Sequence, residues 1–282
     1  MTYDFTVMGI VNVTPDSFSD GGLYLEPRAA VAHGLALQAE GAAILDIGGE
    51  STRPGALPVS EGDELARVMP VIEGLVEAGA GAQLSIDTSK AAVARAALEA
   101  GATFVNDVTA LRHDSEMAML IAERDADCCL MHMLGEPRTM QHDPRYEDVV
   151  SEVKAFLEQR MAFAVAQGIA EERIMLDPGI GFGKTIAHNL ELLRRLQELT
   201  TLGRPLVIGT SRKSFLGRIT GSGVDGRDAG TVATNVIAYE RGARVFRVHD
   251  VRPTHDALAI TAATVRPPWP TTTPTSSTMS TT

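Results

Sequence analysis

Polar side chains that could do chemistry close nearly every short apolar run of the sequence. Eight such runs, each of four to nine residues, end at groups that can bind anions, protons or hydrogen-bond donors. In chain order these groups are Asn12; Asp46 and Glu50; Asp87; Asn106 and Asp107; His132; Asp177; Ser211, Arg212 and Lys213; and Arg247 with His249. A single polar residue after a strand is often a helix cap or a turn residue. Eight in the same place indicate a shared site.

Positive charge gathers among these groups although the protein as a whole is acidic. The chain has 25 Lys and Arg against 36 Asp and Glu, a formal net charge of −11. Nucleic-acid binding, which needs a basic face, is therefore not expected. Arg53, Lys184, Lys213, Arg247 and His249 nevertheless follow the apolar runs. They predict a local cationic cluster for a small anion such as phosphate or diphosphate. Ion pairs with nearby acids are the alternative explanation.

The glycine-rich segment 179–185 and the metal-ligand candidates narrow the chemistry further. The segment ends in Gly-Lys-Thr like a P-loop, but that motif requires glycine where Pro178 stands. Its glycines are better explained by a backbone that passes close to a ligand, with Phe182 packing on it.

No pair of His, Cys or Glu residues has the spacing of a zinc site. Magnesium often takes one or two protein oxygens together with phosphate oxygens, and Asn12 could supply one.

The elements that must position these groups alternate regularly along the chain. The apolar runs are expected to be strands buried on both faces, at residues 5–13, 42–48, 83–87, 104–108, 128–133, 174–177, 206–209 and 245–248. Segments with helical spacing lie between them, for example 27–40, 61–78, 89–100, 145–167 and 187–202. Eight strand–helix units predict an α/β protein of one domain, a (β/α)8 TIM barrel over residues 1–265. An open doubly wound sheet is the alternative.

The rest of the sequence adds expectations about the ends, the loops and the location. Residues 266–282 are rich in Thr, Ser and Pro and are expected to form a disordered tail. Residues 14–22 and 51–55 are long loops rich in glycine and small polar residues, which makes them candidates for mobile lids. No apolar stretch is long enough to span a membrane, and the N-terminus lacks the features of a secretory signal. The adjacent Cys128 and Cys129 are expected to be a buried, reduced pair, so we expect a cytoplasmic protein.

Eight motifs of this sequence together resemble the dihydropteroate synthase family. The two most specific are MGIVNVTPDSFSDGG at residues 8–22 and DIGGESTRPG at residues 46–55. The others are SIDT at 85–88, VNDV at 105–108, MHM at 131–133, LDPGIGFGK at 176–184, SRKS at 211–214 and RVHD at 247–250. The resemblance covers residues 5–263 and leaves out the tail.

The resemblance implies a pterin-binding transferase of folate biosynthesis built on a (β/α)8 barrel. Such an enzyme condenses (7,8-dihydropterin-6-yl)methyl diphosphate with 4-aminobenzoate and yields 7,8-dihydropteroate and diphosphate. By resemblance, diphosphate leaves first and the aromatic amine attacks a pterin cation. The resemblance also implies Mg²⁺ as cofactor, a homodimer, small-molecule partners only, and sulfonamides as inhibitors that mimic 4-aminobenzoate.

The resemblance also implies a role for each matching residue. Those expected to take part in catalysis are Asp20, Arg53, Asp87, Asp177 and Lys213. The expected pterin-binding residues are Asp87, Asn106, Met131, Asp177, Phe182 and Lys213. The expected 4-aminobenzoate-binding residues are Thr52, Arg53, Phe182, Lys213 and Ser214. Asn12, Arg247 and His249 are expected to bind diphosphate, with Asn12 on the metal.

Two other functions fit part of this pattern. A pterin-dependent methyltransferase would share the barrel and the pterin pocket, but it would not need Arg53, the Lys213–Ser214 pair or Arg247 with His249. A non-catalytic paralogue that binds a pterin or a protein should have lost one of these groups. All of them are present, which favours the synthase.

Overall fold

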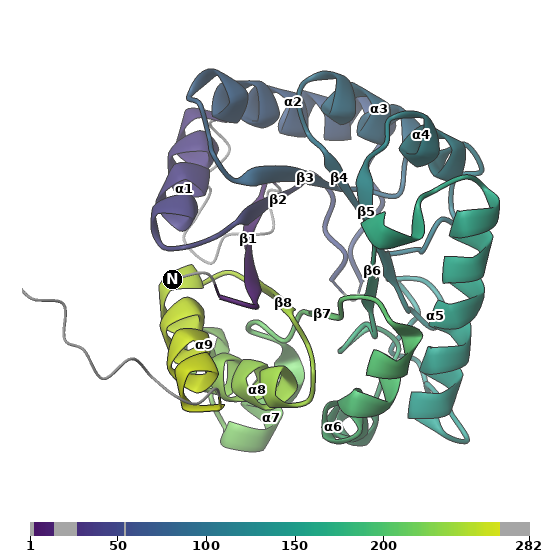
Figure 1. Cartoon of the computed structure of the whole chain (residues 1–282), viewed down its shortest axis with the longest axis vertical. Coiled ribbons are helices and arrows are strands. Elements are labelled where there is room, and N and C mark those ends of the chain that lie inside the picture. The colour runs from purple at the N-terminus through teal and green to yellow at the C-terminus, as the bar shows by residue number, and fades with distance from the viewer. Residues whose placement is uncertain (1–2, 14–26, 54, 266–282) are drawn as a thin grey trace, which may run out of the picture.

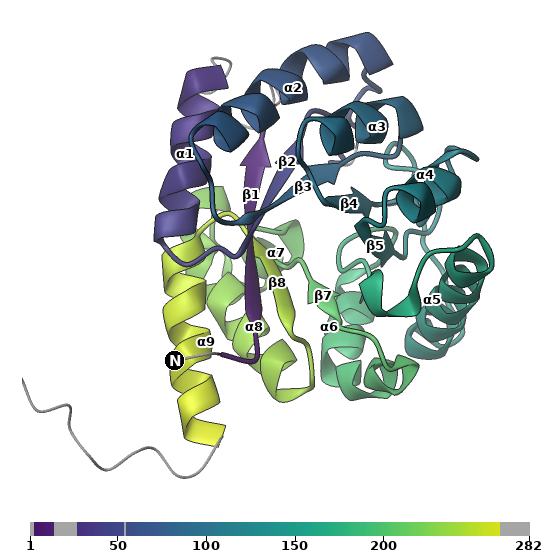
Figure 2. The same ribbon diagram turned by 45° about the horizontal axis from the view of Figure 1, so that its top comes forward.

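Eight parallel strands form the centre of the molecule, and helices surround them (Figures 1 and 2). The structure is a computed structural model that describes residues 3–13, 27–53 and 55–265. The strands are β1 (Thr6–Asn12), β2 (Ile44–Gly48), β3 (Gln83–Asp87), β4 (Phe104–Asp107), β5 (Asp127–Met131), β6 (Ile174–Asp177), β7 (Val207–Ile208) and β8 (Val245–Val248). They pair in the order β6-β5-β4-β3-β2-β1-β8-β7. The predicted barrel is therefore confirmed for the described residues.

The ring of strands is closed between β6 and β7 by a short contact. Leu176 forms a parallel bridge with Leu206, and the Leu176 amide donates to the Pro205 carbonyl at 3.0 Å. β7 has only two residues, so few strand-to-strand hydrogen bonds can form on this side of the barrel. The barrel is nearly closed, in contrast to the open sheet that the sequence had left as an alternative.

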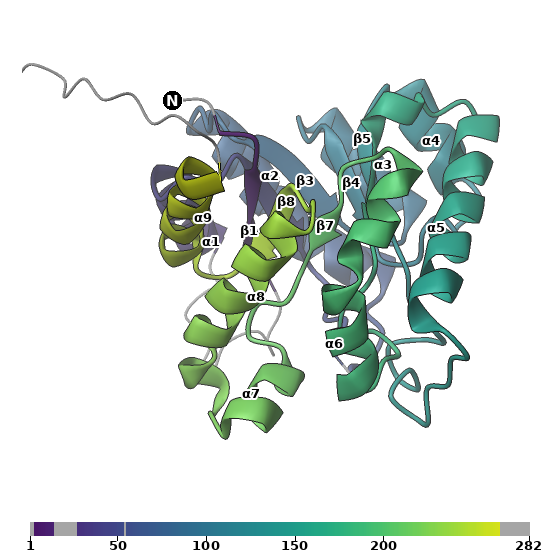
Figure 3. The same ribbon diagram turned by 60° about the horizontal axis from the view of Figure 1, so that its bottom comes forward.

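The helices follow the strands in the expected alternation. They are α1 (Pro27–Ala39), α2 (Glu61–Glu77), α3 (Ala91–Glu99), α4 (Met117–Glu123), α5 (Val149–Ala166), α6 (Ile186–Arg194), α7 (Ser214–Thr220), α8 (Asp228–Glu240) and α9 (Val251–Val265), with 3-10 turns η2 (Glu171–Arg173), η3 (Leu196–Leu202) and η4 (Val224–Gly226). α7 lies at the opposite end of the barrel from the start of β1 (Figure 3). None of the described helices is both long and apolar enough to cross a membrane. The expected tail, 266–282, lies outside the described residues.

Two of the expected helices begin or end differently from the sequence pattern. α5 begins at Val149 and not at residue 145, because the Asp148 side chain caps it by accepting from the Ser151 amide at 2.8 Å. The segment expected as one helix over 187–202 is α6 followed by the 3-10 turn η3, which ends at Gly203 in the left-handed conformation. Both differences change helix ends and leave the barrel unaffected.

The barrel interior consists of an apolar layer below a polar one. The apolar layer is a buried cluster of Met8, Ile44, Phe104, Cys129, Val207 and Val245, with Met175 against it. Side chains two positions apart on a strand point to the same side. The residues two positions further along five of these strands are Asp46, Asn106, Met131, Asp177 and Arg247. Strand register therefore gathers these five side chains into the next layer, at the carboxyl ends of the strands.

Candidate functional site

The carboxylate of Asp46 is the centre of the polar layer. Asp46 has no exposed surface, and its Oδ1 accepts from the Ser85 hydroxyl at 2.6 Å. Its Oδ2 accepts from Asn106 Nδ2 at 3.0 Å and from Arg247 Nε at 2.6 Å. A buried carboxylate is tolerated only when such donors surround it. Asp46 thus fixes the position of two residues that the sequence predicted to bind substrate, Asn106 and Arg247.

Arg247 links Asp46 to Asp87. Its Nη2 donates to Asp87 Oδ2 at 2.6 Å, and its side chain is 22% exposed. Burial raises the pKa of Asp87 to about 7, although the Arg247 charge acts in the opposite direction. Arg247 lies within β8, whose bounds are those of the expected strand 245–248, and points into the barrel; it does not lie past the strand end. Its role in binding diphosphate stays a prediction.

Asp177, the last residue of β6, and Lys213, in the loop after β7, lie at the same end of the barrel. Asp177 Oδ1 accepts from the Gly179 amide at 2.6 Å, and burial raises the pKa of Asp177 while the Lys213 charge lowers it. Lys213 donates to the Ile180 carbonyl, and its Nζ lies 4.5 Å from the centre of the Phe182 ring. Burial lowers the pKa of Lys213 to about 8, against the influence of Asp177. Because this pKa is still above 7, Lys213 stays mostly protonated at neutral pH and can donate hydrogen bonds to a ligand.

His249 lies beside Ser211, after β8. The Ser211 Oγ and His249 Nδ1 are 2.9 Å apart, and the His249 amide donates to the same Oγ at 3.1 Å. Burial, with smaller effects of Arg212 and Arg247, lowers the pKa of His249 to about 3. The ring is therefore neutral at pH 7. His249 therefore adds no positive charge to the predicted cationic cluster in this structure.

Lys184 also does not join the cationic cluster that the sequence predicted. Its side chain is buried, with Nζ 2.8 Å from His132 Nδ1 and 3.0 Å from the Phe182 carbonyl that it donates to. The turn at Gly179 and Gly183 brings the lysine back under the β5 end, away from the surface. The predicted cluster is accordingly smaller than expected.

The residues expected for 4-aminobenzoate surround this region but are more exposed. Thr52 is half-buried and Arg53 exposed, in the loop between β2 and α2, and Ser214 is exposed at the first position of α7. Phe182 packs against a buried cluster of Val108, Met131, Met133 and Met140. Asp20, expected to take part in catalysis, lies outside the described residues, as do residues 14–22 of the first candidate lid. The roles of all of these residues stay predictions.

Sequence reasoning missed the roles of four residues that hold the site together. Asp46 ended a strand in the sequence but received no role, and Ser85 and Ser211 received none either. Lys90 was not noticed at all: it pairs with Glu50 and, at 2.5 Å, with the fully buried Glu64, so it ties the loop after β2 to α2. The period of two from Ile44 to Asp46 was the available signal, because it predicts that Asp46 points into the barrel.

The described residues contain no group of three or more His, Cys, Asp or Glu side chains that could hold a metal ion. A dedicated protein cage for a metal is thus absent from that part of the chain. Asn12 is half-buried at the end of β1 and pairs in register with Gly48, beside Asp87. A single amide oxygen at this place fits a magnesium ion that takes its other ligands from water and a phosphate group.

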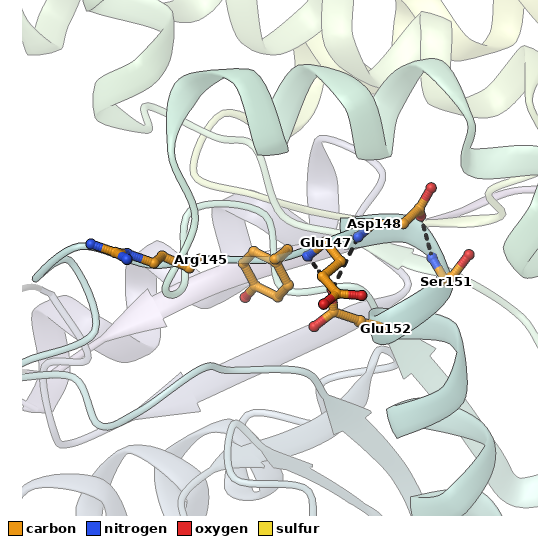
Figure 4. Close-up of a pocket in the computed structure, with 6 residues that line it drawn as sticks. Arg145, Glu147, Asp148, Ser151 and Glu152 are labelled. Carbon is orange, nitrogen blue, oxygen red and sulfur yellow. Dashed lines mark hydrogen bonds between the residues drawn. The ribbon is translucent and has the colours of Figure 1, made fainter.

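A recess lies elsewhere, at the start of α5 (Figure 4). It measures about 530 Å³ and is lined by Arg145, Tyr146, Glu147, Asp148, Ser151 and Glu152. The Glu152 carboxylate already accepts from the Glu147 and Asp148 amides at 2.7 and 3.1 Å. The recess shares no residue with the polar layer and is a capped helix start.

Comparisons with known proteins agree with the geometry. The chain matches the family described as "Pterin binding enzyme" over residues 8–249. It is 50% identical to the dihydropteroate synthase of Neisseria meningitidis serogroup C, over 89% of this chain and 90% of that protein. The Yersinia pestis dihydropteroate synthase, solved with a sulfonamide drug complex, superposes with a TM-score of 0.88 at 46% identity, covering 92% of this chain and 94% of that one. A Xanthomonas albilineans dihydropteroate synthase, solved with 4-aminobenzoic acid, gives 0.86 at 50% identity, covering 93% and 94%.

Proposed function

The chain belongs to the family of pterin-binding enzymes that includes the dihydropteroate synthases, and we propose that it catalyses the reaction of these synthases. It condenses (7,8-dihydropterin-6-yl)methyl diphosphate with 4-aminobenzoate to give 7,8-dihydropteroate and diphosphate, a step of folate biosynthesis. The observation that carries this assignment is that Asn106, Asp177 and Arg247 of the polar layer lie with Asp87 and Lys213 at one end of the barrel. The relatives of the chain match it over nearly its whole length.

The polar layer suits the edge of a pterin ring. Asp87, Asn106 and Asp177 offer oxygen acceptors for the ring and amino N–H groups, and Lys213 offers a donor for the pterin carbonyl and ring nitrogen. Met131 and Phe182 supply apolar surface for the ring faces. A substrate lacking these polar groups would leave buried partners unpaired, at about 1–3 kcal/mol for each. We therefore expect the pocket to select pterins.

In the proposed reaction the bond between the pterin methylene carbon and the diphosphate oxygen breaks first. The electron pair leaves with diphosphate, and a pterin cation remains. We assign the stabilisation of this cation to the carboxylates of Asp87 and Asp177. The amine nitrogen of 4-aminobenzoate then attacks the methylene carbon and loses a proton. A neutral aromatic amine is already nucleophilic at pH 7, so a strong base is not required.

The leaving diphosphate is assigned to Asn12, Arg247 and His249. Nη1 of Arg247 makes no hydrogen bond to the described residues and is directed by the pairs that Nε and Nη2 make. The Ser211 hydroxyl bonded to His249 Nδ1 favours a proton on Nε2, which gives a neutral donor for a phosphate oxygen. Asn12 would hold Mg²⁺, which supplies charge neutralisation of diphosphate when bound.

The 4-aminobenzoate is assigned to Thr52, Arg53, Phe182, Lys213 and Ser214. Arg53 is the natural partner of its carboxylate. The loops that carry Asp20 and Arg53 would exclude water from the cation. Sulfonamides resemble 4-aminobenzoate in shape and charge, and we expect them to compete for the same place. A homodimer in the cytoplasm is also part of the proposal, and the buried free thiols Cys128 and Cys129 are consistent with a reducing compartment.

A product assay tests the proposed function. Purified protein with Mg²⁺, the pterin diphosphate and 4-aminobenzoate should release diphosphate and 7,8-dihydropteroate in equal amounts. Without 4-aminobenzoate, slow formation of the hydroxymethyl pterin is expected, because water can trap the cation. If neither dihydropteroate nor diphosphate forms, the assignment fails. If diphosphate is released only when 4-aminobenzoate is present, the dissociative order is wrong.

A further inference from the structure

Lys184 is a buried lysine whose hydrogen-bond partners are neutral. Its exposed fraction is 2%. Lysines are almost never buried to this extent unless a carboxylate pairs with them. Here Nζ lies 2.8 Å from His132 Nδ1 and donates to the Phe182 carbonyl at 3.0 Å, with the His132 carbonyl at 3.5 Å. Such an arrangement is costly, so it needs a reason beyond packing.

His132 is held as a hydrogen-bond acceptor for this lysine. Burial, reinforced by the Lys184 and Arg112 charges, lowers its pKa to about 2, so the ring is neutral. The ring also packs edge-on against Phe156, with centroids 4.8 Å apart. A neutral ring fixed in this way presents Nδ1 to Nζ of Lys184, whose pKa burial lowers well below that of a free lysine. The contact therefore joins the end of β5 to the loop after β6.

The loop from Gly179 to Lys184 is joined to the segment after β5 at further points. Gln141 Nε2 donates to the Gly181 carbonyl at 2.6 Å, and the Tyr146 hydroxyl donates to the Gly183 carbonyl at 2.8 Å. These two partners are at the surface or half-buried, whereas Lys184 binds from inside. Lys184 thus supports this loop from the interior, together with the buried Asn189, which accepts from the Gly181 amide at 2.7 Å.

The same loop positions the ammonium group of Lys213. The Ile180 carbonyl accepts from Lys213 Nζ, and the centre of the Phe182 ring lies 4.5 Å from the same Nζ. Both contacts come from the four residues that precede Lys184. A displacement of this loop would move both partners of Lys213 at once.

We propose that Lys184 is a positioning residue: with His132 it holds the loop after β6 so that Ile180 and Phe182 place Lys213 for the substrates. The inference rests on the proposed function, because Lys213 matters only if the pterin and 4-aminobenzoate bind beside it. Lys184 itself contacts neither substrate in this assignment. Its effect on the reaction should pass through Lys213.

Hydrogen exchange tests the positioning without any activity measurement. Lys184→Met keeps the length of the side chain but leaves the Phe182 carbonyl and His132 Nδ1 without their donor. We expect the amides of residues 179–184 to exchange at least tenfold faster, while the rest of the barrel and the unfolding midpoint change little, because the cost of burying the amine is removed at the same time. Lys154→Met, the same change on α5, is the control. Unchanged exchange in 179–184, or faster exchange throughout the molecule, would overturn the proposal.

A double-mutant cycle tests whether Lys184 acts through Lys213. We expect Lys184→Met to lower kcat/KM for 4-aminobenzoate at least tenfold, and to cause no further loss when added to Lys213→Met. Independent losses that multiply, or no loss in Lys184→Met, would refute the positioning role. Failure of the proposed function is distinguishable, since the wild-type protein would then make no dihydropteroate while the exchange result would still stand.

A second pair of variants covers the case in which Lys184→Met does not fold. His132→Asn retains an acceptor at the δ position, whereas His132→Leu removes it. We expect His132→Asn to keep kcat/KM within about threefold of wild type and His132→Leu to lose at least tenfold. Equal losses in both variants would mean that the acceptor for Lys184 is irrelevant.

Discussion

The carboxylate of Asp46 has no exposed surface, yet three side chains donate to it. Arg247 supplies the only charged donor among them and continues to Asp87. One guanidinium therefore bridges two carboxyl groups inside the barrel. In a chain with a net charge of −11, this arrangement keeps the acceptors that we propose for a pterin and the positive charge that we propose for diphosphate at one end of the barrel.

Arg247→Ala is expected to cost stability as well as activity. Removal of one partner of a buried ion pair leaves an uncompensated charge, so the free energy of unfolding should fall by about 3 kcal/mol. Because Arg247 orients Asp87, binding of a pterin without diphosphate should weaken too. Denaturant unfolding and calorimetric titration measure the two effects. The double variant Asp46→Asn, Arg247→Met should regain part of the stability; no recovery would show that the charge of Asp46 is not the cause.

Asp87 should make stability fall as the pH rises. Burial raises its pKa from 3.8 to about 7, so between these values the folded state holds a proton that the unfolded chain has lost. The free energy of unfolding then decreases with pH, by at most about 1.4 kcal/mol per unit. Unfolding of wild type and Asp87→Asn should be compared from pH 4.5 to pH 7. The expected difference changes steadily across this window, and a constant difference would contradict the raised pKa.

In the loop after β6, Gly179 is required because a neighbouring main-chain atom leaves no room for a side chain. A Cβ on Gly179 would overlap the His132 carbonyl oxygen, and the residue has a φ of +68°. Gly203 has a similar φ of +74° but nothing within 4 Å of its Cβ position. The two positions thus separate backbone strain from collision.

Gly179→Ala should therefore be much more harmful than Gly203→Ala. The second substitution carries only the left-handed backbone penalty of roughly 1 kcal/mol. The first must also move the loop or β5, and we expect a loss above about 3 kcal/mol together with loss of pterin binding. Thermal unfolding of both variants measures this. Similar losses would show that the loop has room to shift.

The strands were predictable from sequence because a strand buried on both faces is a continuous apolar run. The polar groups that end these runs indicated which side of the barrel carries the site. The pairing within the site was not predictable, since Arg247 and Asp46 are 201 positions apart and meet only through the register of β8, β1 and β2. For the same reason the burial of Lys184, which depends on the packing of two loops, could not be read from its place in a glycine-rich motif.

Two neutral histidines should make the whole molecule sensitive to acid. Burial lowers the pKa of His132 to about 2 and of His249 to about 3. Below pH 6.5 the unfolded chain takes up protons that the folded protein does not, so stability declines as the pH falls toward 3. His249→Gln should reduce the slope of the free energy of unfolding between pH 3.5 and pH 6 by up to about 1.4 kcal/mol per unit. An unaltered slope would mean that His249 is charged in the folded state.

The most direct test of the proposed function is a crystal structure of this protein with 7,8-dihydropteroate bound. The account predicts the pterin ring within hydrogen-bond distance of Asp87, Asn106, Asp177 and Lys213, at the carboxyl ends of the strands, with the benzoate portion toward Arg53 and Ser214. Product bound at the recess before α5, or a pterin ring that leaves Asp87 and Asp177 without contact, would contradict it.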